Sequence, residues 1–221
     1  MTGIQEQVPS TSYIVVEGPI GVGKTSLARR LADSFGSELL LEGPDDNPFL
    51  ERYYQNPRDA AFATQMYFLM QRAEQLGRLR QSDLFATTRV ADFLFDKDRL
   101  FAQLTLQPEE YGLYRKVHDA IALDAVPPDL VIYLQAPVEV LLERIRRRGI
   151  DYEQTISADY LARLCDAYVE FFYHYEQSPL LIVNAAEIDL VDNDADYQQL
   201  LDRVRGLQPG RHFFNPSPIA L

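Results

Sequence analysis

Residues 13–26 of the chain read YIVVEGPIGVGKTS. The run begins with a mostly apolar segment, as in a buried parallel strand, and residues 18–25 have the Gly-x-x-x-x-Gly-Lys-Thr spacing of a P-loop. Leu27, Leu31 and Phe35 then recur at helical spacing, so the loop is expected to open a helix. Strand, glycine-rich loop and helix in this order indicate a phosphate-binding site rather than a chance glycine-rich turn.

The loop has the groups that a polyphosphate requires. Its glycines allow backbone N–H groups to point inward, and the positive end of the following helix adds to the attraction. Lys24 can reach the outer phosphates, and the Thr25 hydroxyl can ligate Mg²⁺. The residues expected to hold the nucleotide are Gly18, Pro19, Ile20, Gly21, Val22, Gly23, Lys24, Thr25 and Ser26.

Length and composition bound the class of protein. The chain has 221 residues, enough for one α/β domain with a full core, and it has no apolar run long enough to span a bilayer. Its net charge of −12 argues against a nucleic-acid polymer or an anionic membrane as partner, because both are bound through surplus Lys and Arg. The single cysteine, Cys165, excludes an internal disulfide. Since the sequence shows no signal peptide, we expect a cytoplasmic protein.

Apolar runs alternate with helical patterns along the rest of the chain, which predicts a parallel sheet covered by helices on both faces. The five expected strands span residues 13–17, 38–42, 84–91, 129–135 and 180–184. The expected helices span residues 24–35, 58–81, 98–104, 108–124, 137–148, 158–176 and 195–205. We interpret residues 1–221 as one domain, in which 1–12 and 207–221 are irregular tails.

Ligands of parallel sheets bind beyond the carboxyl ends of the strands, and two acids are expected there. Glu42 ends the second strand, where it is either a general base for an attacking hydroxyl or a solvated loop acid. Asp92 ends the third strand, where it either helps to hold Mg²⁺ or caps the following helix. We favour the metal role for Asp92, because a P-loop requires a second acidic partner.

Two predicted helices carry polar groups of interest. Gln65 and Arg72 share one face of the helix at 58–81, either as an amide–guanidinium reader for a planar polar ligand or as a helix flank with a snorkelling arginine. Arg144 and Arg148 share one face at the end of the helix at 137–148, with two further arginines between them. That segment is either a mobile lid that stabilises a transferred phosphoryl group or a set of solvated arginines at a helix C-terminus. We favour the lid, because four arginines within five residues stand out on a chain whose net charge is −12.

Further motifs follow the P-loop in a fixed order. They are EGPIGVGKT (17–25), EGPDDNPFL (42–50), Tyr54 before Pro57, QMY (65–67) with Arg72, Asp98 before LFA (100–102), and LVIYL (130–134) ahead of the arginines. With these motifs, residues 13–205 resemble the deoxynucleoside kinase family. The resemblance implies a P-loop nucleoside/nucleotide kinase fold. It also implies transfer of phosphate from ATP and Mg²⁺ to the 5′-hydroxyl of deoxycytidine, deoxyguanosine or deoxyadenosine, in nucleotide salvage.

The resemblance also implies roles for the matching residues. Glu42 matches the base that receives the proton of the 5′-hydroxyl, Asp92 matches an acid near the metal, and Gln65 matches the residue that hydrogen-bonds the nucleobase. The other matching residues come in pairs: Arg72 with Asp98 at the base edge, Tyr54 with Glu153 at the sugar 3′-hydroxyl, and Arg144 with Arg148 as lid arginines on phosphate.

Two positions depart from the family pattern. Phe93 stands where the family has an arginine that helps to hold the phosphates and the reacting hydroxyl, and Arg89 is nearby but inside a predicted strand. Ile150 stands in place of a further lid arginine. Removal of one such electrostatic contact commonly costs about 3 kcal/mol, roughly a hundredfold in rate. The site therefore compensates from elsewhere, or is weakly active, or takes a different substrate.

The sequence thus predicts a single-domain kinase that binds ATP, Mg²⁺ and a nucleoside. Two alternatives are a P-loop kinase for another small hydroxyl or monophosphate acceptor, and a nucleotide-binding regulatory protein with a weakened catalytic centre. Members of the family are commonly dimers, so the apolar faces of the helices at 58–81 and 108–124 are expected to form a homodimer interface.

Overall fold

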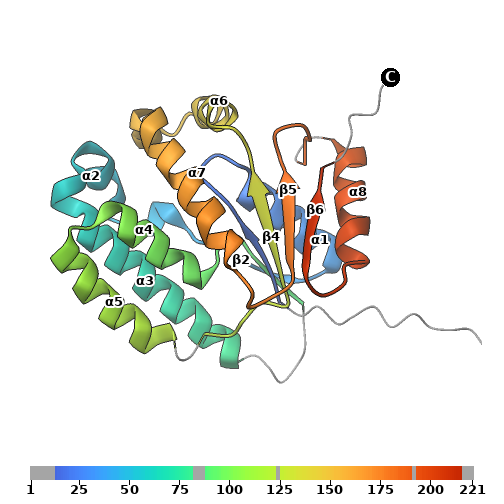
Figure 1. Cartoon of the computed structure of the whole chain (residues 1–221), viewed down its shortest axis with the longest axis horizontal. Coiled ribbons are helices and arrows are strands. Elements are labelled where there is room, and N and C mark those ends of the chain that lie inside the picture. The colour runs from blue at the N-terminus through green and yellow to red at the C-terminus, as the bar shows by residue number, and fades with distance from the viewer. Residues whose placement is uncertain (1–12, 82–87, 123–124, 191–192, 216–221) are drawn as a thin grey trace, which may run out of the picture.

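The computed structural model of the chain describes residues 13–81, 88–122, 125–190 and 193–215. Its centre is a sheet of six parallel strands in the order β2-β3-β1-β4-β5-β6 (Figure 1). The strands are β1 (Tyr13–Glu17), β2 (Glu38–Leu40), β3 (Arg89–Ala91), β4 (Leu130–Gln135), β5 (Leu180–Asn184) and β6 (Arg211–Phe214). Val15 of β1 pairs with Ala91 on one side and with Val131 on the other. The strand order changes direction at β1, which is where open α/β sheets bind their ligands.

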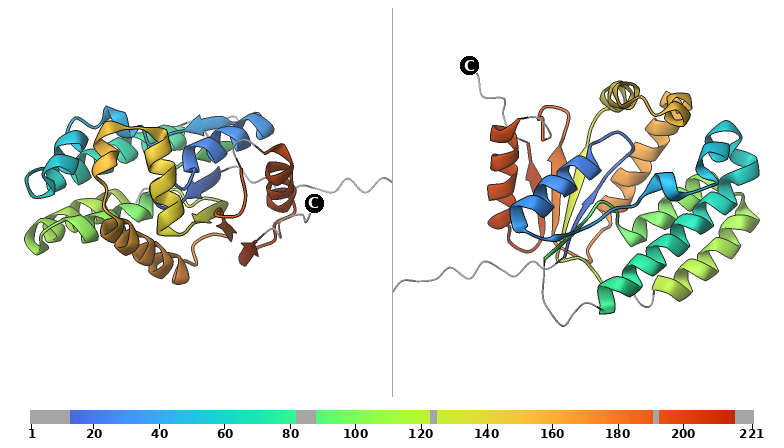
Figure 2. Two further views of the ribbon diagram at one scale, coloured as in Figure 1. Left: turned by 90° about the horizontal axis from the view of Figure 1, so that it is seen from above. Right: turned by 180° about the vertical axis from the view of Figure 1, so that it is seen from behind.

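Helices cover both faces of this sheet. They are α1 (Lys24–Phe35), α2 (Leu50–Gln55), α3 (Pro57–Gln81), α4 (Asp98–Thr105), α5 (Pro108–Ala122), α6 (Val138–Arg148), α7 (Ala158–Tyr173) and α8 (Asp194–Arg205). Helices α1 and α7 lie on opposite faces, and α3, α4 and α5 pack into a helical layer next to α7 (Figure 2). In the described part of the chain, no helix is long and apolar enough to cross a bilayer.

The strands of the sheet centre are apolar because both faces are covered. Val15, Val16 and Ile132 are fully buried, and Tyr133 of β4 stacks on Phe172 of α7 with ring centroids 4.2 Å apart. This continuous burial accounts for the apolar runs by which β1 and β4 were predicted. The α/β fold with a parallel sheet is thereby confirmed.

The sheet has six strands rather than the expected five, because Arg211–Phe214 pairs with the outer edge of β5. The expectation that residues 207–221 form an irregular tail is therefore wrong for this strand. An unpaired strand edge offers a row of N–H and C=O groups, and β6 satisfies them. The strand expected at 84–91 begins at Arg89 in the structure, and residues 84–87 lie outside the described ones.

Candidate active site

The P-loop leaves the carboxyl end of β1 and leads directly into α1. A Cβ atom on Gly18 would lie 2.5 Å from the backbone oxygen of Leu134, so only glycine fits where the loop passes β4. The Lys24 ammonium donates hydrogen bonds to the carbonyl oxygens of Gly18, at 2.8 Å, and Pro19, at 3.2 Å. Burial, and then the nearby Lys97 ammonium, lower the pKa of Lys24 to about 8. Lys24 is thus held across the loop, on the side where a polyphosphate would bind.

Asp92 connects the P-loop to the segment after β2. One of its carboxylate oxygens accepts a hydrogen bond from the Thr25 hydroxyl at 2.5 Å, and the other accepts one from the Glu42 N–H at 2.8 Å. The hydroxyl and carboxylate oxygens are the ligand types that Mg²⁺ prefers. The described residues include no cluster of three or more His, Cys, Asp or Glu that would hold a metal by itself. The donor set therefore fits an ion that takes most of its ligands from phosphate and water.

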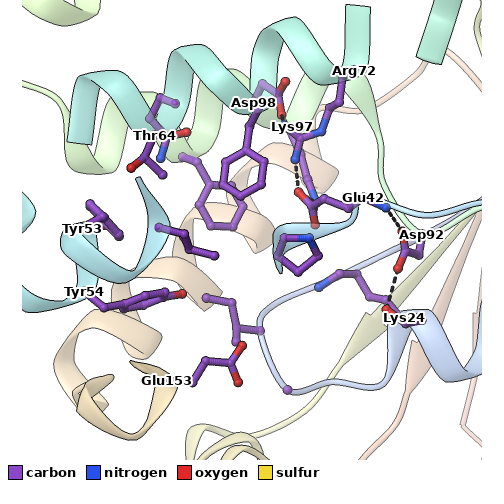
Figure 3. Close-up of a pocket in the computed structure, with 18 of the residues that line it drawn as sticks. Lys24, Glu42, Tyr53, Tyr54, Thr64, Arg72, Asp92, Lys97, Asp98 and Glu153 are labelled. Atoms are coloured by element: carbon purple, nitrogen blue, oxygen red, sulfur yellow. Dashed lines mark hydrogen bonds and ion pairs between the residues drawn. The ribbon is translucent and has the colours of Figure 1, made fainter. Parts of the chain in front are cut away.

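A pocket opens between the P-loop, α3 and α4 (Figure 3). Most of the residues predicted to act in the reaction line it: Lys24, Thr25, Glu42, Tyr54, Gln65, Arg72, Asp92, Asp98, Arg148 and Glu153. Gln65 and Arg72 both project from α3 into this pocket and are buried, so they do share one face of the helix. Their burial decides against a solvated helix flank with a snorkelling arginine.

Glu42 lies among positive charges at the P-loop end of this pocket. Its carboxylate forms an ion pair with Arg72, and the Lys97 ammonium lies 3.3 Å from the same carboxylate. The second guanidinium nitrogen of Arg72 pairs with Asp98 at 2.7 Å. Burial raises the pKa of Asp98 to about 6, against the opposing effect of Arg72 and Lys97. Glu42 is consequently a fixed and charge-balanced carboxylate rather than a solvated loop acid.

Three residues that line the pocket carry buried hydrogen-bonding groups without partners. Among the described residues, the Thr64 hydroxyl, the Nε of Arg72 and one carboxylate oxygen of Asp98 are buried with no hydrogen-bond partner. All three residues line the pocket. Buried polar groups cost free energy unless they are paired, so this arrangement suits a polar ligand that offers both donors and acceptors.

Another part of the pocket wall is formed by Tyr54, Arg148 and Glu153. The Tyr54 ring stacks on Tyr152 with centroids 5.5 Å apart, and burial raises the pKa of the Tyr54 hydroxyl. Arg148, at the end of α6, forms an ion pair with Glu153. The predicted pair of Tyr54 and Glu153 thus lines the pocket together, next to one of the predicted lid arginines.

A second hollow lies on the other side of the P-loop, between α6 and the segment after β5. It is lined by loop residues predicted to hold the nucleotide, namely Gly21, Val22, Gly23, Lys24, Thr25 and Ser26. Arg144 lines this hollow, where its guanidinium donates to the backbone oxygens of Val22 and Ala185. Arg148 lines both hollows, so the two predicted lid arginines have different surroundings.

Sequence reasoning missed Glu17 and Lys97. Glu17 ends the apolar run of β1 and is fully buried, and Lys97 is 1% exposed and lines the pocket. The sequence did contain a signal for Glu17, because an acid at the end of a buried strand requires a positively charged partner nearby. Arg89 forms an ion pair with Glu38 of β2 and lines neither hollow, so it does not replace the arginine that the resemblance expects at Phe93.

Comparison with known proteins identifies the family of this chain. The family model for deoxynucleoside kinase matches residues 14–208, and the chain therefore belongs to the deoxynucleoside kinase family, whose members are phosphotransferases. The deoxyguanosine kinase of Bacillus subtilis (strain 168) is 34% identical over 88% of this chain and 97% of its own length. The deoxyadenosine/deoxycytidine kinase of the same organism is 27% identical, over 90% and 94%. The structure of deoxyadenosine kinase from M. mycoides with bound dCTP superposes with a TM-score of 0.77 at 23% identity, over 88% of this chain and all of that one.

Proposed function

We propose that this protein transfers the outer phosphoryl group of ATP to the 5′-hydroxyl of a purine deoxynucleoside or deoxycytidine, as a step of nucleotide salvage. The observation that carries the proposal is the position of Glu42. Its backbone N–H is tied to Asp92 beside the P-loop, and its side chain lies in the pocket that Gln65 and Arg72 line. A carboxylate between a phosphate cradle and an acceptor pocket is placed to receive a hydroxyl proton.

The chain's own residues supply positioning and charge in this scheme. Lys24 leaves the Gly18 and Pro19 carbonyl oxygens to contact the outer phosphates, and Glu42 takes the proton of the attacking hydroxyl. Thr25 and Asp92 would hold Mg²⁺, which supplies neutralising charge on the phosphate oxygens when bound. Arg144 and Arg148 stabilise the phosphates from α6, and closure of that segment excludes water.

The unpaired groups of the pocket favour particular bases. The free carboxylate oxygen of Asp98 requires a donor, and adenine, guanine and cytosine each carry an exocyclic amino group that can serve. Thymine has no exocyclic amino group and can offer this oxygen only its ring N3–H, so we expect it to fit less well. The deoxyguanosine and deoxyadenosine/deoxycytidine kinases named above support this preference by kinship.

The test is ATP-dependent phosphorylation of a panel of four deoxynucleosides, the matching ribonucleosides and the nucleoside monophosphates. We expect turnover of deoxyguanosine, deoxyadenosine or deoxycytidine, and a loss of about 100- to 10,000-fold in kcat for Glu42→Gln. Glu170→Gln, which neutralises an exposed acid on α7, is the matched control and should retain full activity. Turnover confined to thymidine or to a monophosphate, or an active Glu42→Gln, would contradict the proposal.

We also infer that the protein is a cytoplasmic homodimer, since ATP is available there and two outer helices carry exposed apolar side chains. Met70 of α3 and Leu113 of α5 are 53% and 54% exposed, and the two helices pack side by side. Light scattering on the wild type and on Met70→Glu/Leu113→Glu should give a dimer and a monomer. A wild-type monomer at micromolar concentration would contradict this assembly.

A further inference from the structure

Lys97 is a lysine that is almost fully enclosed by protein beside the predicted base. It ends the short 3₁₀ helix η2 (Phe95–Lys97), which follows β3, and its side chain is 2% exposed. Its ammonium lies 3.4 Å from a carboxylate oxygen of Glu17. It also lies 3.3 Å from a carboxylate oxygen of Glu42, and Figure 3 shows Lys97 and Glu42 together in the pocket. A buried ammonium is retained only where specific partners compensate for its lost hydration.

Glu17 is the fixed end of this arrangement. Its first carboxylate oxygen accepts from the Gly18 N–H at 2.8 Å and from the Tyr168 hydroxyl at 2.9 Å, and its second accepts from the Leu94 N–H at 2.8 Å. These bonds come from the P-loop, from α7 and from the segment after β3, so the Glu17 carboxylate has no freedom to move. Lys97 is therefore anchored on its inner side and meets Glu42 on its outer side.

No positive charge reaches Glu42 from the position directly after Asp92. Phe93 occupies that position and is fully buried, and Arg89 is paired with Glu38 on β2. Within the described residues, the cations that contact Glu42 are Arg72 and Lys97. Arg72 also pairs with Asp98 in the part of the pocket proposed to bind the base. Lys97 is therefore the cation that links Glu42 to β1, through its contact with Glu17.

We propose that Lys97 is a positioning residue for the reaction, which holds the Glu42 carboxylate in place between the P-loop and the acceptor pocket. The proposal rests on the proposed role of Glu42. It also places a cation beside Glu42 in a site where Phe93 supplies none.

Several charged groups face Lys97. They are Glu17 from β1, Lys24 from α1, Glu42 after β2, Arg72 from α3, Asp92 after β3 and Asp98 from α4. Burial lowers the pKa of Lys97, and the Glu17 carboxylate opposes that shift most strongly. Removal of the Lys97 ammonium would break the link between Glu42 and the fixed Glu17 carboxylate, so the base is expected to lose its position.

The experiment compares kcat and the KM for the deoxynucleoside, at saturating ATP and one fixed pH, for the wild type, Lys97→Met, Lys97→Arg and Arg99→Met. Arg99 is an exposed cation on α4, so Arg99→Met is the matched control for loss of one charge. We expect Lys97→Met to lower kcat by about 100-fold with little change in KM, because a displaced base slows the chemical step and not the binding of the nucleoside. Lys97→Arg should restore most of kcat, and Arg99→Met should keep the wild-type values.

Thermal unfolding and ATP affinity show whether each variant is folded. The double variant Glu17→Gln/Lys97→Met removes the buried acid together with its cation, so it tests the same point if Lys97→Met alone does not fold. An unchanged kcat in folded Lys97→Met, or a loss of kcat that Lys97→Arg does not rescue, would show that Lys97 is only structural and would overturn the proposal. An active Glu42→Gln would instead show that the proposed function has failed.

Discussion

Comparison of Gly18 with Gly23 allows backbone strain and steric contact in the P-loop to be measured separately. Its φ of +151° lies outside the range that other residues readily adopt, and a Cβ there would lie 2.5 Å from the Leu134 carbonyl oxygen. Gly23 has a φ of +103°, but a Cβ there meets nothing within 4 Å. Gly77, inside α3, has neither a positive φ nor a close neighbour. Gly18 therefore has both a strained φ and a close contact, Gly23 has the strained φ alone, and Gly77 has neither.

The magnitudes follow from these contacts. A forbidden backbone conformation costs about 1 to 3 kcal/mol, and an overpacked contact costs about 1 to 3 kcal/mol more. Gly18→Ala carries both costs, which lowers Tm by roughly 4 to 24 °C at about 2 to 4 °C per kcal/mol. Gly23→Ala carries the first alone, which is roughly 2 to 12 °C. Gly77→Ala should raise the free energy of unfolding by about 0.5 to 1 kcal/mol, because alanine is the better helix former.

The assay is thermal unfolding without nucleotide, so that effects on ligand binding do not enter. Calorimetry of the three variants and the wild type should rank Tm as Gly77→Ala, wild type, Gly23→Ala and Gly18→Ala, from highest to lowest. If Gly18→Ala is no less stable than Gly23→Ala, the close approach of the loop to β4 is not a constraint. If Gly77→Ala is less stable than the wild type, the packing of α3 is not as described.

Three further predictions concern the site. The KM for the nucleoside should rise as the pH falls through about 6, because protonated Asp98 loses an acceptor for the base, and Asp98→Asn should abolish this pH dependence in steady-state assays. Tyr168→Phe removes a 2.9 Å hydrogen bond to buried Glu17 and should lower the free energy of unfolding by about 1 to 3 kcal/mol in denaturant titrations, whereas no loss would mean that Glu17 is satisfied without it. Chelation of divalent cations should abolish turnover, and Asp92→Asn should raise the Mg²⁺ concentration for half-maximal rate about tenfold; an unchanged requirement would exclude Asp92 from the metal site.

Local patterns in the sequence were sufficient for the elements that bind phosphate. The apolar run of β1, the glycine spacing and the helical spacing of α1 are all encoded within one short stretch, and the structure confirms each. Gln65 and Arg72 were likewise predictable, because helix geometry alone places residues seven apart on one face. Whether that face met a ligand pocket or solvent depended on the packing of α3 against α4 and could not be read locally.

The features that escaped prediction depend on distant partners. β6 is a short edge strand in which exposed side chains alternate with partly buried ones. It forms because β5 would otherwise have an unpaired edge, and residues 211–214 contain no local pattern that predicts this pairing. Lys97 lies in the run Asp96-Lys97-Asp98, which is as polar as an exposed helix start. Its burial is imposed by Glu17 and Glu42, which come much earlier in the chain.

The charge pattern of the two hollows has a consequence for how they communicate. Three acids of the acceptor pocket, Glu42, Asp98 and Glu153, already have a cation, so much of the field around the reacting hydroxyl is set before ligands arrive. Arg148 differs from the others, because it lines both hollows and its side chain is 45% exposed. The ion pair holds Arg148 against Glu153, and a phosphate in the second hollow would attract the same guanidinium. We therefore expect ATP and the nucleoside to affect each other's affinity through Arg148 and Glu153, since both residues line the acceptor pocket and Arg148 also lines the second hollow.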